Sequence, residues 1–145
     1  MITTSAETDA LKLCQVVLDS TGPRRLAEFY RSLLGPVYAS GDEPPGVGEP
    51  DGRGRERLVL PTEEGTPQPA FQHVDRLTPP ARPEGSVPQQ PHLDLSVASL
   101  DDVKVQHERV LALGGRLPSD NEQGPDEPFR VYADLSGHPF CVFVA

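Results

Sequence analysis

The chain has 145 residues, with 22 acidic and 13 basic side chains, a net charge of −9 and a pI near 4.8. This length suits one ordinary domain, which buries about two-thirds of the surface of its unfolded chain. The acidic balance disfavours nucleic acid and anionic membrane surfaces as partners, because both carry negative charge.

The N-terminus and the hydropathy of the chain predict a soluble cytoplasmic protein. Residues 1–10 lack the basic region and apolar run of a signal peptide, and no apolar stretch of the sequence is long enough to cross a bilayer. The two cysteines, Cys14 and Cys141, are too few for a disulfide framework. Strand alternation places their side chains on opposite faces, so we expect no bridge between them.

The first half of the chain predicts a strand, a helix and further strands. Apolar and polar residues alternate from Leu11 to Asp19, which is typical of a half-buried strand. A helix begins at Gly22-Pro23, carries one apolar stripe, and ends at Gly35-Pro36. The acidic segment Gly41 to Gly54 predicts a loop that could cover a cavity as a lid. Further strands are expected at Val37 to Ser40, Arg57 to Pro61 and Pro69 to Leu77.

The second half repeats this order of elements after a linker. Residues 78–90 contain several prolines, which favour an extended and semi-rigid connector. A strand at Pro91 to Ala98 leads into a helix that is capped by Ser99 and ends at Gly114-Gly115. The remaining elements are a short strand at Leu117, an acidic loop from Asp120 to Glu127, and strands at Phe129 to Leu135 and Pro139 to Val144.

The two halves are also similar in sequence. Gln15 to Asp19 matches His92 to Ser96 at a shift of 77 residues, and Phe71-Gln72 matches Phe140-Cys141 at a shift of 69. Two copies of one β-α-β-β-β unit predict a pseudo-symmetric α+β fold with a cleft where the copies face each other. We expect one domain over residues 1–145, with module 1 at about 10–77, the linker at 78–90 and module 2 at about 91–145.

The chain resembles the vicinal oxygen chelate superfamily, which contains glyoxalases, bleomycin-resistance proteins and extradiol dioxygenases. Its final strand, with Pro139-Phe140-Cys141, looks most like the glyoxalase-like branch. The resemblance implies two βαβββ modules that form an open, U-shaped mixed sheet around a small-molecule cavity, and it implies frequent dimerisation. The segments that carry it are Val16 to Tyr30 with Leu34-Gly35, Ala70 to Gln72, His92 to Leu95, and Ala133 to Val142.

The resemblance also implies where a metal would bind. Family members that use a metal take one ligand from the first and one from the last strand of each module, which corresponds here to Gln15, Gln72, His92 and Cys141. Only His92 is a ligand that the family commonly uses, and Gln72 and Cys141 replace the usual carboxylates. Hard divalent cations prefer carboxylate and imidazole ligands. We therefore expect no bound metal.

Two catalytic alternatives remain open at these positions. In the first, Asp94 or Asp19 supplies a carboxylate that completes a divalent metal site with His92, since residues i and i+2 share a strand face. In the second, an imidazolium at His92 lowers the thiol pKa of Cys141 and activates it as a nucleophile. The candidate catalytic residues are His92, Cys141 and Asp94.

Aromatic side chains are expected to complete the cavity. Tyr132 and Phe143 would form an apolar wall beside a few polar groups, which is the usual composition of a ligand pocket. Phe71 and Phe140 are expected to face the helices instead. The candidate ligand-binding residues are Gln15, Gln72, His92, Cys141, Tyr132 and Phe143.

These observations predict a glyoxalase-like protein that binds a small organic molecule in the cleft between its modules. We expect a binding protein of the bleomycin-resistance kind, without a metal cofactor, and we expect it to form a homodimer. The alternative is an enzyme, namely a lyase, isomerase or dioxygenase, that uses a divalent metal at His92. The sequence leaves the identity of the ligand open.

Overall fold

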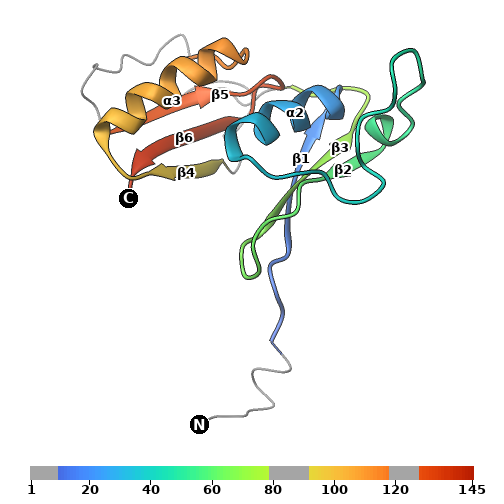
Figure 1. The fold of residues 1–145 in the computed structure, drawn as a ribbon, viewed down its shortest axis with the longest axis horizontal. Coiled ribbons are helices and arrows are strands. Elements are labelled where there is room, and N and C mark those ends of the chain that lie inside the picture. Colours follow the sequence, from blue (N-terminus) through green and yellow to red (C-terminus); the bar gives the residue numbers. More distant parts are fainter. Residues whose placement is uncertain (1–9, 79–91, 118–127) are drawn as a thin grey trace.

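The structure, a computed structural model, describes residues 10–78, 92–117 and 128–145. Two mixed sheets of three strands form its frame, with the orders β1-β3-β2 and β4-β6-β5 (Figure 1). In each sheet the central strand has one parallel and one antiparallel neighbour. The elements are β1 (Gln15–Ser20), α2 (Pro23–Leu34), the 3₁₀ helix η1 (Arg53–Arg55), β2 (Arg57–Val59), β3 (Gln68–His73), β4 (Leu93–Val97), α3 (Leu100–Ala112), β5 (Phe129–Ala133) and β6 (Pro139–Val144).

This arrangement confirms the predicted α+β fold of two βαβββ-like modules. The strand expected to follow the helix in each module is reduced. Residues 37–40 form no strand, and the Ala39 N–H donates to the Val59 carbonyl at 3.3 Å. In module 2, Arg116 forms an isolated bridge with Ala133.

Both helices have ends that match the signals in the sequence. Pro23 occupies the first turn of α2, where its missing N–H costs nothing, and Gly35 ends the helix with a φ of 85°. The Ser99 hydroxyl caps α3 by accepting a hydrogen bond from the Asp102 N–H at 3.2 Å. Within the described ranges, no helix is long and apolar enough to cross a membrane.

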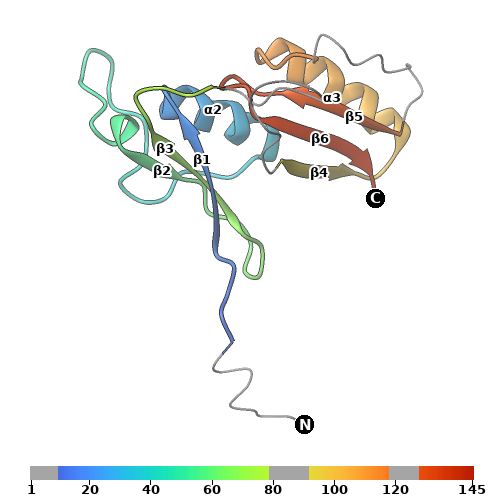
Figure 2. The same cartoon turned by 180° about the vertical axis from the view of Figure 1, so that it is seen from behind.

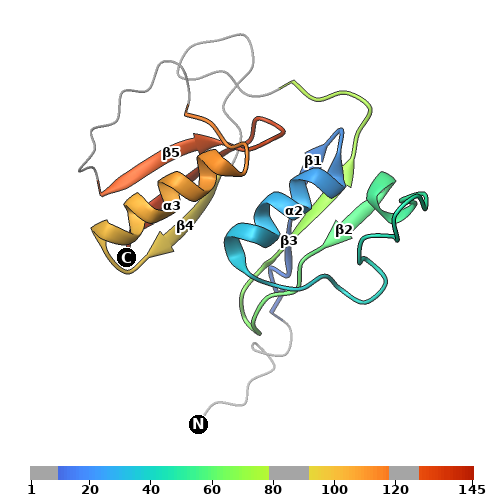
Figure 3. The same ribbon diagram turned by 45° about the horizontal axis from the view of Figure 1, so that its top comes forward.

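An aromatic core joins the two modules through α2. Tyr30 stacks on Phe71 of β3 with ring centroids 5.7 Å apart, and it meets Phe140 of β6 edge-on at 5.9 Å. Phe29 contacts Phe140 at 5.8 Å. All four rings are buried, so Phe71 and Phe140 face the helices as predicted. Figure 3 shows α2 lying along the first sheet and α3 along the second.

The strand β1 begins at Gln15 and not at Leu11 as predicted. Its pairing with β3 starts at Gln15, which lies opposite Gln68. The residues before it extend away from the body of the protein (Figure 2), and the side chains of Leu11 and Leu13 are 98% and 73% exposed. An alternating pattern forms a strand only where a neighbouring strand offers hydrogen-bond partners.

The acidic segment 41–54 is tied to the body of module 1. The buried Asp42 carboxylate accepts hydrogen bonds from the Arg53 guanidinium at 2.8 Å and from the Val59 N–H at 2.9 Å. Arg24 of α2 donates to both carboxylate oxygens of Asp51, which lowers the pKa of that carboxyl. These contacts hold the segment against α2 and β2, so they argue against the predicted role as a lid. Most of the predicted linker, and the predicted loop at 120–127, lie outside the described residues.

Candidate functional site

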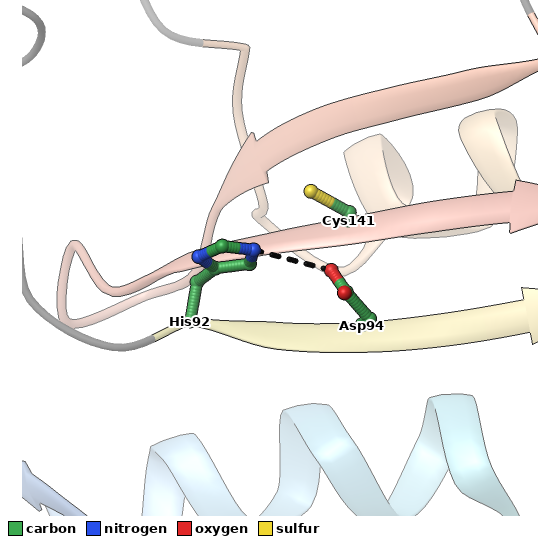
Figure 4. Close-up of side chains that lie close together, drawn as sticks. All are labelled: His92, Asp94 and Cys141. Carbon is green, nitrogen blue, oxygen red and sulfur yellow. Dashed lines mark ion pairs between the residues drawn. The ribbon is translucent and has the colours of Figure 1, made fainter.

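Three predicted site residues meet on the second sheet. Asp94 of β4 lies opposite Cys141 of β6 in the strand register, and His92 precedes Asp94 by two residues. His92 Nε2 lies 3.2 Å from Asp94 Oδ1, and the potential ligand atoms of all three side chains lie within 4.8 Å of one another (Figure 4). His92 and Asp94 are solvent-exposed. The structure thus brings together the three candidate catalytic residues.

The two candidate residues of module 1 contact a residue that the sequence interpretation did not include. Arg57 of β2 donates a hydrogen bond from one terminal nitrogen to Gln72 Oε1 at 3.0 Å. Its other terminal nitrogen donates to Gln15 Oε1. Gln15 and Gln72 are therefore connected through a guanidinium, which carries a permanent positive charge.

The strand register explains why a guanidinium fits between these amides. Gln15 lies opposite Gln68 on β3, whereas Gln72 lies opposite Asp19 on β1. Gln15 and Gln72 are therefore four positions apart along the sheet, which corresponds to about 13 Å. The long side chain of Arg57 spans this backbone separation, and its two terminal nitrogens bind both amide oxygens to one guanidinium.

The two modules differ in register by two residues. In module 2, Leu93 lies opposite Phe140, and the sequence match between the halves predicts that Val16 would lie opposite Phe71. In the structure, Phe71 lies opposite Leu18. A slip of two residues keeps every side chain on its own face of the sheet. The buried pattern is thus the same in both modules, but the polar residues of module 1 are displaced along the strands.

The residues fit a family-type metal site only in module 2. Gln15 and Gln72 are neutral amides whose oxygens are occupied by a cation, so they cannot complete a four-ligand site with His92 and Cys141. The trio of His92, Asp94 and Cys141 supplies imidazole, carboxylate and thiolate, which are the ligand types of zinc. Three protein ligands and an open position would suit a catalytic rather than a structural zinc.

The predicted cavity position of Tyr132 is wrong. Tyr132 lies opposite Phe140 in the β5–β6 pair, and the two rings stack with centroids 5.3 Å apart. Opposite residues of an antiparallel pair share a face, so Tyr132 faces the helices. Its hydroxyl is 2.8 Å from His107 Nδ1 on α3, and burial raises its pKa to about 12. Phe143, two residues from Cys141, stays on the face away from the helices, as predicted.

A hollow of about 680 Å³ lies between the two modules. It is lined by Val16 of β1, Pro69 of β3, Leu34 at the end of α2, and Leu93 and Leu95 of β4. The hollow lies between the repeats, but not at the residues for which the sequence predicts a ligand. On β1 the lining residue is Val16, which faces the helices. The described residues that line the hollow do not include Gln15, Gln72, His92 or Cys141.

Asp94 connects the hollow with the His92 cluster, because it belongs to both.

The sequence analysis missed Arg57, although a signal for it exists. Buried Leu58 and Leu60 alternate with Arg57 and Val59, which predicts that Arg57 shares the face of Gln15 and Gln72. A cation on that face should have been considered together with the two amides.

Comparisons with known proteins agree with this architecture. The glyoxalase-like domain family matches residues 15–143, which includes both modules. No curated protein matches the chain at a significant level.

Solved structures share the fold over most of their length. A glyoxalase-related enzyme from Fulvimarina pelagi is 18% identical, with a TM-score of 0.62 over 94% of this chain and 89% of that one. A glyoxalase/bleomycin resistance protein/dioxygenase family enzyme from Burkholderia phytofirmans is 14% identical, with a TM-score of 0.62 over 91% and 97%. A fosfomycin resistance protein from Listeria monocytogenes, in complex with Mn(II) and 1S,2S-dihydroxypropylphosphonic acid, is 13% identical, with a TM-score of 0.61 over 94% and 90%.

Sequence identities this low establish the fold alone, whereas the family match spans nearly the whole chain. The chain therefore belongs to the glyoxalase-like domain family.

Proposed function

We propose that the protein binds a small organic molecule in the hollow between its modules, as a binding or resistance protein that needs no metal. The observation that carries this proposal is the hollow, which has a volume of about 680 Å³ and a wall from both modules. Pockets of roughly 300–1,000 Å³ are typical of small-molecule sites in proteins. Its position between the two repeats supports a binding role.

The wall of the hollow favours a guest with an apolar body. Aliphatic and proline side chains form most of it, and Asp94, Glu63 and Thr62 add polar groups. Each 100 Å² of apolar guest surface that leaves water contributes about 2.5 kcal/mol to binding. A carboxylate such as Asp94 would then orient a hydrogen-bond donor or a cationic group of the guest.

The proposed absence of a metal is supported by the contacts of module 1. Two of the four positions that the family uses for a metal, Gln15 and Gln72, instead hold the guanidinium of Arg57. A second cation beside this guanidinium would be repelled, and the neutral amides would not offset its dehydration.

A second candidate function is favoured by the cluster on the second sheet. The atoms of His92, Asp94 and Cys141 that could hold a metal lie within 4.8 Å of one another. These residues could hold zinc, which would act as a Lewis acid for a lyase or isomerase reaction. A dioxygenase reaction would instead need a redox-active metal such as iron, because zinc has no redox chemistry. Without a metal, Asp94 could orient His92 as a general base beside the Cys141 thiol.

Elemental analysis of the purified protein separates these two functions. We expect protein prepared without chelators to contain less than about 0.1 metal ion per chain, because module 1 contributes no fourth ligand and two of the three groups in module 2 are solvent-exposed. Added zinc should leave the thermal unfolding midpoint unchanged, since an ion that does not bind the native state cannot stabilise it.

A matched pair of variants identifies the site if a metal is found. His92→Ala removes the central imidazole, whereas His73→Ala removes a strand histidine that likewise precedes an aspartate by two residues, Asp75. A stoichiometric metal that is lost in His92→Ala and kept in His73→Ala would contradict the metal-free proposal and support the enzyme.

We also propose that the protein forms a homodimer in the cytoplasm. Exposed Leu11 and Leu13 precede β1, an edge strand of its sheet, and could pack against a second copy. Light scattering after size exclusion should then give about twice the 15.7 kDa mass of one chain. The double variant Leu11→Ser/Leu13→Ser should shift the mass towards that of the monomer. A monomeric wild-type protein at tens of micromolar would contradict the dimer.

A further inference from the structure

We propose that Arg57, Gln15 and Gln72 form a binding site for an anionic oxygen group on the open face of the first sheet. The open face is the side of β1, β2 and β3 that points away from α2. None of the three residues is among the described residues that line the hollow. The site is therefore separate from the proposed small-molecule hollow and goes beyond the proposed function.

The strand register shows how Arg57 reaches both amides. Arg57 and Gln72 lie opposite each other, and the next row of the same face holds Val59, Ala70 and Val17. Ala70 is the smallest residue of this row, so the Arg57 side chain can lie across it towards Gln15. Ala70 is 0% exposed although it points to the open face, as expected if the aliphatic part of Arg57 covers it.

The cluster offers more free hydrogen-bond donors than free acceptors. The oxygens of both amides accept from Arg57, which turns the amide NH₂ groups of Gln15 and Gln72 away from it. A guanidinium has five N–H groups, and the two bonds to the amides leave three without an acceptor among the described residues. A ligand at this position must therefore supply acceptor oxygens.

The charge of the cluster selects an anion over a neutral acceptor. Guanidinium groups bind carboxylate and phosphate oxygens through paired, charge-assisted hydrogen bonds, which are stronger than bonds between neutral groups. Arg57 is only partly buried, so an anion can reach it from solvent. Asp19 lies in the same row as Gln72 and Arg57, and its exposed carboxylate weakens the positive potential of the site.

This arrangement departs from the metal chemistry that the fold family implies. Where the family would place two metal ligands, this chain places a fixed organic cation and two neutral amides. The guanidinium can supply the positive charge that a metal would otherwise provide, but it presents N–H groups and not open coordination positions. The expected ligand is thus an organic anion that is held by hydrogen bonds.

Side-chain NMR of the glutamine amides tests the proposal directly. Benzoate and benzamide serve as probes, because they have nearly the same shape and differ in charge. We expect benzoate to shift the Nε2 resonances of Gln15 and Gln72, and benzamide to shift them much less at equal concentration and ionic strength. Arg57→Gln should weaken benzoate binding at this site by about tenfold or more, the range that loss of a charge-assisted hydrogen bond produces.

Three further variants serve as controls. Arg55→Gln removes the same charge two residues away, where the side chain is exposed, and should change affinity by less than about twofold. Arg57→Lys keeps the charge but loses the planar fork, so its affinity should be intermediate. Asp19→Asn should tighten benzoate binding, because it removes the nearby negative charge.

The proposal is overturned if benzamide shifts the two amides as strongly as benzoate, or if Arg55→Gln weakens binding as much as Arg57→Gln. Leu34→Trp, which fills the hollow, should leave these amide shifts unchanged, because Leu34 lines the hollow and not the open face. Loss of the shifts in Leu34→Trp would place benzoate in the hollow and would also overturn the proposal. Binding in the hollow can therefore fail or succeed independently of this site.

Discussion

Replacing Asp134 by alanine is expected to lower the free energy of unfolding by about 3 kcal/mol or more. The Asp134 side chain is fully buried between the modules and accepts hydrogen bonds from the Tyr30 hydroxyl at 2.6 Å, the Ser136 N–H at 2.9 Å and the His138 N–H at 3.0 Å. Alanine leaves these donors without a partner, and each unpaired buried donor costs about 1–3 kcal/mol. Urea unfolding followed by circular dichroism measures the loss.

Two matched variants test whether the loss comes from the hydrogen bonds. Tyr30→Phe removes one donor, so it should cost about 1 kcal/mol. Asp75→Ala removes a fully exposed carboxylate and should change stability by no more than about 0.5 kcal/mol. Burial, and then the neighbouring Asp134, raise the pKa of Tyr30 well above its usual value, so Tyr30 remains a donor. An Asp134→Ala loss no greater than that of Tyr30→Phe would contradict the network.

This network also shows what joins the modules. Asp134 follows β5, and Tyr30 belongs to α2, so their bond crosses from one module to the other. The turn after Asp134 brings His138 Nε2 within 2.6 Å of the Asp19 carbonyl at the end of β1. The structure assigns the His138 ring to the contact between the two halves.

The repeated fold could be predicted from the sequence because strand alternation and helix-end signals are both local patterns. Alternation of apolar residues marks β4 and β6, and Pro23, Gly35 and Ser99 mark helix ends. The grouping of His92 with Asp94 was also accessible, since residues i and i+2 share a strand face, and the family resemblance placed Cys141 near His92. Local signals of this kind depend only on neighbouring residues, which explains why they were reliable.

The register of module 1 could not be predicted in the same way. A slip of two residues leaves the buried pattern unchanged, so a sequence pattern gives no preference between the two pairings. This slip separates Gln15 from Gln72 and makes room for Arg57. The predicted position of Tyr132 was wrong for a related reason. Alternation defines two faces of β5 but does not say which face the helix covers. The candidate site depends on such relations between distant strands.

Filling the hollow with a large side chain is expected to abolish binding of an apolar guest. Leu34 lines the hollow from the end of α2 and is 41% exposed, so Leu34→Trp can place an indole in the cavity without disturbing buried contacts. We expect the affinity for N-phenyl-1-naphthylamine, a neutral fluorescent probe, to fall by at least about 50-fold. Exclusion of roughly 100 Å² of its apolar surface accounts for a loss of this size.

Leu111→Trp is the matched control for this prediction. Leu111 has the same exposed fraction of 41% and lies on α3, outside the lining of the hollow. The same substitution there should leave probe fluorescence and affinity unchanged, and both variants should keep the unfolding midpoint of the wild-type protein within about 2 °C. Equal probe binding in the two variants would show that the guest sits elsewhere. That result would contradict the proposed function, because the hollow is the place where residues of both modules could contact one ligand.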